Sequence, residues 1–133
     1  MITYVDSSVL LARYLSEERA REATLLLRQS EGLVASRIAA IEVKRGLRFI
    51  SSPVERVTAQ STFAHEWRSL TVVEIDASLA DLAARIAAET GVRCLDSIHV
   101  ASAVVTSADR FMTLDHRQAE TARAYALAVV GVS

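Results

Sequence analysis

Four acidic residues stand where an α/β chain brings side chains together: Asp6, Glu42, Asp96 and Asp115. Asp6 ends the apolar run ITYV and Asp115 ends the apolar run FMTL, and both runs are typical of short strands. In an open parallel sheet, ligands bind outside the carboxyl ends of the strands, so both residues fall in the expected position. Carboxylates gathered there repel one another unless a hard cation such as Mg²⁺ or Mn²⁺ joins them. The pattern therefore indicates metal-dependent chemistry.

Each acidic residue also has an ordinary structural explanation. The three aspartates stand at the N-termini of predicted helices, where a carboxylate caps free N–H groups and is favoured by the helix dipole. Glu42 lies inside the helical segment SRIAAIEVKRGL, with apolar neighbours on almost every side. Charged groups are rarely buried without a partner, so the structural alternative for Glu42 is an ion pair with Lys44 or Arg45.

The combination of four carboxylates is harder to explain by capping. Two unit charges 4 Å apart interact with roughly 4 kcal/mol at an effective dielectric of 20. Four such charges in one pocket would cost a substantial part of a domain's net stability of about 5–15 kcal/mol. A divalent cation offsets this repulsion, lowers the pKa of bound water and neutralises charge that develops on a phosphoryl group. Phosphodiester hydrolysis needs the last two effects at neutral pH, so it is the reaction that the set favours.

Two hydroxyls and a histidine accompany the acidic residues. Ser8 lies two residues after the first aspartate, where its hydroxyl either directs a metal-bound water or caps the helix. Thr113 lies two residues before Asp115, so on a strand both side chains point to the same face. Thr113 then either orients the carboxylate or simply fills the strand. For His99, packing near the rim of the site is favoured over a role as base or ligand.

A basic track follows Glu42 on the same predicted helix, formed by Lys44, Arg45 and Arg48. Arg45 is one turn from Glu42 and is predicted to reach a substrate phosphate, with the other two extending the track. A solvated helix face is the alternative. Lys44 is the only lysine in the chain. A phosphotransfer enzyme with Asp6 as nucleophile would need a lysine after a later strand, which argues against that class.

Composition limits the class of protein. The chain has 133 residues, 51% hydrophobic and 23% charged, as expected for one globular domain. The net charge of −1 excludes a strongly basic nucleic-acid binder but not a local basic patch. We expect a cytoplasmic protein without a membrane segment, because no apolar run approaches ~18 residues and no signal peptide stands at the N-terminus. The single cysteine, Cys94, suits a reducing compartment, and we expect it to be buried.

The elements that must position these residues alternate along the chain. Strands are predicted over residues 2–5, 33–36, 70–75, 111–114 and 126–130, and helices over residues 9–18, 19–29, 37–47, 53–68, 79–89, 96–105 and 117–124. Such alternation implies right-handed crossovers and a mainly parallel sheet covered on both faces. The predicted fold is a three-layer α/β/α sandwich with about five strands, forming a single domain over residues 1–133.

With these segments in place, the sequence resembles the PIN-domain ribonucleases, in particular the VapC toxins of toxin–antitoxin pairs. The matching segments are VDSSVLLARYL, SRIAAIEVKRGL, LDSIHVASAV and FMTLD, in the family's order and spacing. The resemblance implies that the catalytic and metal-binding residues are Asp6, Glu42, Asp96 and Asp115, with Ser8 and Thr113 as neighbouring hydroxyls. One departure is Ser97, where a small apolar residue is common, and we expect it not to disturb the chemistry.

The resemblance also implies an activity and partners. Water attacks an RNA phosphodiester in the presence of Mg²⁺ or Mn²⁺ and leaves a 5′-phosphate and a 3′-hydroxyl. The toxin forms a homodimer, and a VapB-like antitoxin covers its site. The alternative is a catalytically inactive PIN-like interaction module, against which the complete set of acidic residues argues.

Overall fold

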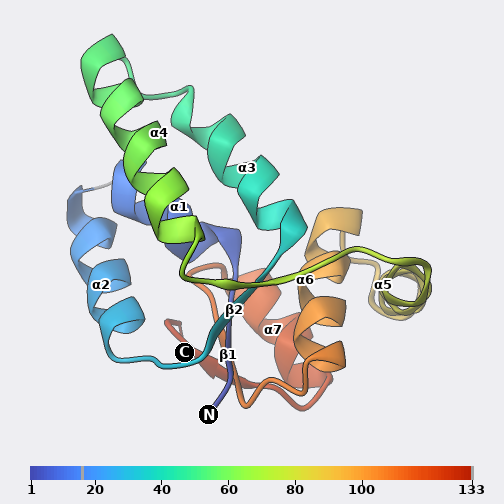
Figure 1. Cartoon of the computed structure of the whole chain (residues 1–133). Coiled ribbons are helices and arrows are strands. Elements are labelled where there is room, and N and C mark those ends of the chain that lie inside the picture. Colours follow the sequence, from blue (N-terminus) through green and yellow to red (C-terminus); the bar gives the residue numbers. More distant parts are fainter. Residues whose placement is uncertain (16, 133) are drawn as a thin grey trace.

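The computed structural model describes residues 1–15 and 17–132, and its centre is a parallel β-sheet (Figure 1). The strand order is β3-β2-β1-β4-β5, and every neighbouring pair is parallel. The strands are β1 (Thr3–Val5), β2 (Leu33–Ser36), β3 (Thr71–Val73), β4 (Arg110–Met112) and β5 (Ala128–Val130). The helices are α1 (Ser7–Leu15), α2 (Glu17–Arg28), α3 (Arg37–Leu47), α4 (Pro53–Trp67), α5 (Ala77–Thr90), α6 (Cys94–Val105) and α7 (His116–Ala124). The predicted α/β/α fold with a parallel five-stranded sheet is confirmed.

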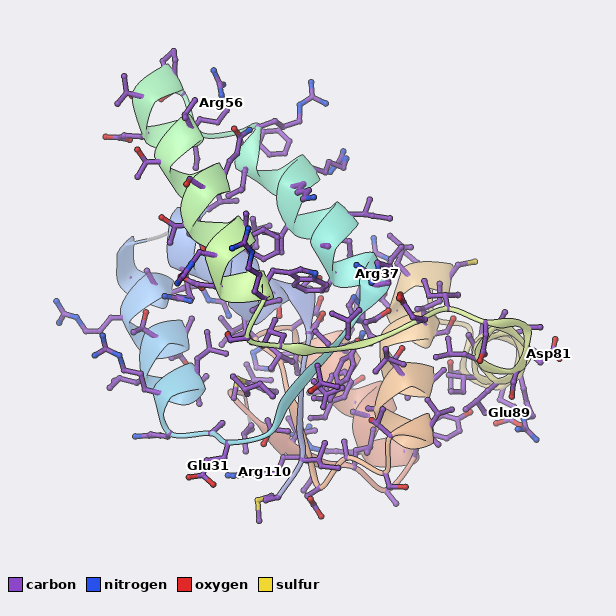
Figure 2. All side chains as sticks on the ribbon, in the orientation of Figure 1. Glu31, Arg37, Arg56, Asp81, Glu89 and Arg110 are labelled. Atoms are coloured by element: carbon purple, nitrogen blue, oxygen red, sulfur yellow. The ribbon has the colours of Figure 1, made fainter. Side chains whose placement is uncertain are left out.

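The sheet separates two hydrophobic cores, because successive strand residues point to opposite faces. Val5 and Met112 face a core that they share with helices α1 to α4. Tyr4 and Phe111, their neighbours along β1 and β4, face a second core formed with helices α5 to α7. Charged side chains such as that of Asp81 project outward from the helices (Figure 2). None of the described helices is both long enough and apolar enough to span a bilayer.

The strand order places a topological switch between β1 and β4. From the central strand β1 the chain first builds β2 and β3 on one side, and then β4 and β5 on the other. The segments that leave β1 and β4 therefore diverge, which opens a crevice at the carboxyl ends of these strands. The Asp6 N–H donates to the Met112 carbonyl at 2.9 Å, so Asp6 continues the β1–β4 pairing to the edge of this crevice.

Local signals set the helix boundaries. Ser36 caps α3, its hydroxyl accepting the Ile38 N–H at 3.2 Å. Ser52 caps α4 just before Pro53, and Asp76 caps α5. Gly91 ends α5 with φ 76°, a left-handed conformation that glycine adopts without steric cost.

Several predicted boundaries were wrong by a few residues. The predicted helix 9–18 ends at Leu15; Ser16 lies outside the described residues, and α2 begins directly after it. Strand β3 spans only 71–73 of the predicted 70–75. The predicted strand 126–130 begins at Ala128, because Ala126 has φ 63° and belongs to a turn. The predicted strand 111–114 ends at Met112, so Thr113 lies just beyond it.

The start of α6 corrects two further predictions. The helix begins at Cys94, two residues before the predicted start at Asp96, so Asp96 lies in its first turn. Cys94 is exposed rather than buried, because the inward face of α6 is formed by residues further along the helix. Ser97 is buried, and its hydroxyl donates to the Cys94 carbonyl at 2.8 Å, so it needs no other partner.

Candidate functional site

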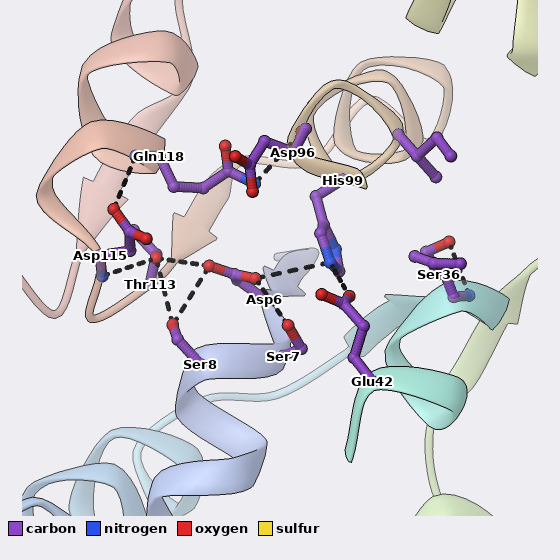
Figure 3. Close-up of polar contacts among 12 residues, drawn as sticks. Asp6, Ser7, Ser8, Ser36, Glu42, Asp96, His99, Thr113, Asp115 and Gln118 are labelled. Atoms are coloured by element: carbon purple, nitrogen blue, oxygen red, sulfur yellow. Dashed lines mark hydrogen bonds and ion pairs between the residues drawn. The ribbon is translucent and has the colours of Figure 1, made fainter. Parts of the chain in front are cut away.

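A cavity of about 430 Å³ lies at the carboxyl ends of β1 and β4. All four acidic residues predicted from the sequence line it, each from a different element. Asp6 follows β1, Glu42 comes from α3, Asp96 from the first turn of α6, and Asp115 from the residue before α7 (Figure 3). The remaining lining residues are Ser7, Ser8, Leu11, Leu15, Arg45, Gly46, Phe49, Arg93 and Leu95. The topology thus brings the four carboxylates to one place.

Asp6 is held by three hydroxyls and is only 5% exposed. Thr113 Oγ1 donates to Asp6 Oδ2 at 2.6 Å, and Ser8 Oγ donates to the same oxygen at 3.1 Å. Ser7 Oγ donates to Oδ1 at 3.3 Å. The Thr113 hydroxyl also accepts the Asp115 N–H at 3.0 Å, which ties the segment after β4 to the segment after β1. Both predicted hydroxyls therefore contact a site carboxylate or its neighbour.

Glu42 pairs with His99 rather than with either basic neighbour on α3. His99 Nε2 lies 2.6 Å from Glu42 Oε1 and 3.6 Å from Asp6 Oδ1, and the ring is 1% exposed. Its other nitrogen, Nδ1, lies 2.6 Å from the Tyr4 hydroxyl. The sequence favoured a histidine packed at the rim, so its direct contact with two site carboxylates was missed. Its position one turn after Asp96, on the inner side of α6, is the signal that would have indicated it.

The neighbours of His99 and Tyr4 shift the pKa values of both side chains. Burial lowers the pKa of His99, but the charge of Asp6 and the hydrogen bond that the ring donates to Glu42 outweigh burial and raise the pKa above its usual value. Burial and the charge of Asp6 raise the pKa of Tyr4 well above its usual value, so its hydroxyl stays protonated.

Asp96 forms an ion pair with Arg93, and both side chains line the cavity. Arg93 Nε lies 3.4 Å from Asp96 Oδ2, and the arginine side chain is mostly exposed. Burial raises the pKa of Asp96 against the opposing effect of Arg93, and the charges of Asp6 and Asp115 raise it further. The site carboxylates therefore act on one another electrostatically, as expected for a set that a cation would join.

Asp115 combines capping with a position in the cavity. Its Oδ1 accepts the Arg117 N–H at 2.8 Å and the Gln118 N–H at 3.2 Å, so it is the N-cap of α7. The capping alternative is therefore correct for one oxygen only. Within residues 1–15 and 17–132, no hydrogen bond engages Glu42 Oε2, Asp96 Oδ1 or Asp115 Oδ2. Three carboxylates thus each keep one oxygen available to a ligand.

This donor set fits Mg²⁺ or Mn²⁺, because hard divalent cations prefer carboxylate oxygens. The side chains line the cavity without closing on one point: in the described part of the chain, no three acidic, histidine or cysteine side chains are close enough to hold an ion. Asp6, Glu42, Asp96 and Asp115 are the residues of this cavity that would hold such an ion.

The basic residues divide into two groups. Arg45 lines the cavity, as does Arg93, which the sequence pattern did not indicate. Lys44 on α3 and Arg48, the residue after α3, are exposed and do not line the cavity. The two arginines lie in the same pocket as the carboxylates, whereas Lys44 lies outside the pocket of Asp6. This placement agrees with the argument against a phosphotransfer enzyme.

The sequence matches the profile of the family described as PIN domain over residues 3–124, most of the chain. Comparison with curated proteins gives no significant match. Similar solved structures include FitAcB from Neisseria gonorrhoeae (TM-score 0.76, 17% identity, 96% of each chain covered). A toxin–antitoxin complex from Klebsiella pneumoniae is also similar, with a TM-score of 0.72, 16% identity, and 87% of this chain and 88% of the other covered. VapBC2 from Rickettsia felis, bound to a promoter DNA fragment, is similar with a TM-score of 0.71, 14% identity and 98% of each chain covered.

Proposed function

Because this chain belongs to the PIN domain family, we propose that it is a Mg²⁺- or Mn²⁺-dependent endoribonuclease that acts as the toxin of a toxin–antitoxin pair. The observation that carries this proposal is the convergence of four carboxylates on one cavity. The proposed reaction is hydrolysis of an RNA phosphodiester, with water as nucleophile and a 5′-phosphate and a 3′-hydroxyl as the product ends.

Each acidic residue has a proposed task. Asp6, Asp96 and Asp115 would hold the metal, and Glu42 would complete a second position or orient the attacking water. When bound, the metal lowers the pKa of water and neutralises charge on the phosphoryl group. Asp6 suits its task because its hydroxyl contacts restrict its rotation before any ligand arrives.

The two arginines at the cavity would bind the RNA backbone. Arg45 on α3 and Arg93, the residue before α6, both line the cavity that holds the carboxylates. Arginine presents a planar fork that matches phosphate geometry, so the pair suits the phosphates that flank the scissile bond. Lys44 and Arg48 would extend this contact along the exposed side of α3 and the residue that follows it.

The proposed partner is a VapB-like antitoxin that covers the site of a toxin homodimer, and the proposed location is the cytoplasm. The Klebsiella structure of the same fold is a toxin–antitoxin complex, which supports this assignment. The rim of the cavity carries exposed apolar side chains, with Leu15 at 42% and Phe49 at 66% exposure. An antitoxin segment that packs on them would bury the apolar area and close access to the carboxylates.

The decisive experiment is an RNA cleavage assay with the purified chain freed of antitoxin. We expect cleavage with Mg²⁺ or Mn²⁺, none with EDTA, and product ends that ligate as 5′-phosphates. Cleavage in EDTA, or 2′,3′-cyclic phosphate ends, would contradict metal-dependent hydrolysis. Metal binding without cleavage of any RNA tested would favour the inactive interaction module.

Replacing Thr113 by valine is expected to weaken Mn²⁺ binding by about 10–100-fold, because groups that orient metal ligands contribute effects of this size. Valine keeps the shape but loses the hydroxyl that donates to Asp6 and accepts the Asp115 N–H. Titration calorimetry with Mn²⁺ measures the change.

The matched control for Thr113→Val is Thr3→Val. Thr3 is also fully buried at the sheet, but its hydroxyl has no hydrogen-bond partner within the described residues. We expect Thr3→Val to leave Mn²⁺ affinity unchanged and stability equal or higher. Equal Mn²⁺ affinity in both variants would show that the Thr113 hydroxyl does not orient the site.

A further inference from the structure

A buried hydrogen-bonded chain runs behind the cavity from the sheet to Glu42. It joins Tyr4 on β1, His99 on α6 and Glu42 on α3, and both of its links measure 2.6 Å. Figure 3 shows the link between His99 and Glu42. Tyr4 and His99 are almost completely buried, whereas Glu42 is partly exposed at the cavity wall. The chain therefore connects a rigid part of the fold to one carboxylate of the site.

The hydrogen-bond partners assign the direction of each link. The Ser36 N–H donates to the Tyr4 hydroxyl oxygen at 3.3 Å, which leaves the tyrosine O–H free to donate to His99 Nδ1. A carboxylate only accepts, so His99 Nε2 carries the proton in the bond to Glu42. The bond to Glu42 has this direction in the neutral and the charged ring alike, because Nε2 donates in both, whereas in the charged ring Nδ1 also carries a proton and donates to the Tyr4 oxygen. The imidazole thus presents a fixed N–H donor to Glu42.

This donor determines how Glu42 meets the cavity. Oε1 is occupied by the imidazole, so Oε2 is the oxygen available to a ligand. A free glutamate side chain samples many rotamers and loses conformational entropy when a ligand fixes it. Because His99 already fixes Glu42 in the folded protein, ligand binding no longer carries that entropic cost. The same Nε2 lies 3.6 Å from Asp6 Oδ1, so the N–H stands between two carboxylates that repel each other.

We propose that His99 is a positioning residue of the site, which holds Glu42 with one oxygen toward the cavity and is itself held by the Tyr4 hydroxyl. The proposal rests on the proposed function in one respect, that Glu42 takes part in metal binding. His99 touches no metal or RNA in this role and acts only through Glu42 and, more weakly, through Asp6. The acidic motifs in the sequence do not indicate this role for His99.

The test compares Mn²⁺ affinity, by calorimetry on the full chain, in variants of His99 and Glu42. We expect His99→Leu to weaken Mn²⁺ binding by about 10–100-fold. His99→Gln places an amide N–H near the former Nε2 and is expected to restore most of the affinity. In the double variant with Glu42→Gln, His99→Leu should add little to the loss caused by Glu42→Gln alone, because His99 acts through Glu42.

Two further variants separate positioning from stability. Tyr4→Phe keeps the ring stacked on Phe111 but removes the hydroxyl, and it should weaken Mn²⁺ binding less than His99→Leu. The control is Val100→Ala, a fully buried residue of α6 that does not line the cavity. It should lower the unfolding temperature and leave Mn²⁺ affinity unchanged. If His99→Leu does not fold, Tyr4→Phe carries the test, and unchanged Mn²⁺ affinity in that variant would overturn the proposal.

The outcomes distinguish the two proposals. If Glu42→Gln leaves Mn²⁺ affinity unchanged, Glu42 is not a metal-binding residue. The proposed metal site then lacks Glu42, and the positioning role of His99 is overturned with it. If Glu42→Gln weakens binding while His99→Leu does not, or if their effects are fully additive, only the positioning role is overturned. Full additivity would mean that His99 acts independently of Glu42.

Discussion

Asp6→Asn is expected to lower kcat/KM for metal-dependent RNA cleavage by on the order of 10²–10³-fold or more, with the fold intact. Asp6 is the most buried of the four acidic residues, and the hydroxyls of Ser8 and Thr113 both donate to it. The substitution removes the negative charge that a metal ion would need from this position. It leaves a carbonyl oxygen that can still accept the Thr113 hydroxyl, so the link between β1 and the segment after β4 is kept.

The stability of this variant gives an independent measurement. Without metal, the neutral side chain no longer repels the carboxylates of Glu42 and Asp96, so the unfolding temperature should equal or exceed that of the wild type. Added Mg²⁺ or Mn²⁺ should raise the unfolding temperature of the wild type, because a ligand that binds the native state stabilises it. The same addition should have little effect on Asp6→Asn.

The matched control is Asp81→Asn. Asp81 is exposed on α5 and points away from the body of the molecule, so the same chemical change there should alter neither cleavage nor the response to metal (Figure 2). RNA cleavage by Asp6→Asn within a few-fold of the wild type would remove Asp6 from the site. If the metal stabilised Asp6→Asn and Asp81→Asn equally, Asp6 would not be a metal-binding residue.

The convergence of the acidic residues was predictable because strand direction and sheet order determine it. A carboxylate directly after a buried strand, as Asp6 is, comes to the same edge as any residue that follows a neighbouring parallel strand. Glu42 was predictable for a different reason, since a charged residue among apolar neighbours needs a partner. Asp115 shows the limit of this reasoning, because its two oxygens divide between the capping role and the cavity, and the sequence presented these as alternatives.

The missed features depend on contacts between distant segments. The partners of His99, Glu42 and Tyr4, lie 57 and 95 residues away along the chain. Helical spacing within α6 does not predict which residues of other elements contact it. Arg93 was missed because the start of α6 was placed at Asp96, and an acidic residue is favoured both at an N-cap and in the first turn. Cys94 was predicted to be buried from its residue type, whereas its place in the first turn of α6 exposes it.

Gly131→Ala is expected to destabilise the protein by on the order of 2–5 kcal/mol and also to weaken Mn²⁺ binding. Gly131 has φ 109°, a conformation that is strained for any residue with a side chain. A Cβ atom there would lie 2.2 Å from the Thr113 carbonyl oxygen, which belongs to the backbone and can move only if the segment after β4 moves. Thr113 donates its N–H to the Val130 carbonyl and its hydroxyl to Asp6, so displacing it disturbs both the β4–β5 pairing and the site.

Gly91→Ala is the matched control, because Gly91 also has a positive φ, 76°, but a Cβ there would meet no atom within 4 Å. We expect Gly91→Ala to cost only the backbone strain of about 1–2 kcal/mol and to leave Mn²⁺ affinity unchanged. Urea unfolding and Mn²⁺ calorimetry on both variants separate the two effects. Equal stability losses would mean that the contact between Gly131 and Thr113 does not constrain the fold. A larger loss for Gly131→Ala with unchanged Mn²⁺ affinity would mean that the Thr113 backbone can shift without moving Asp6.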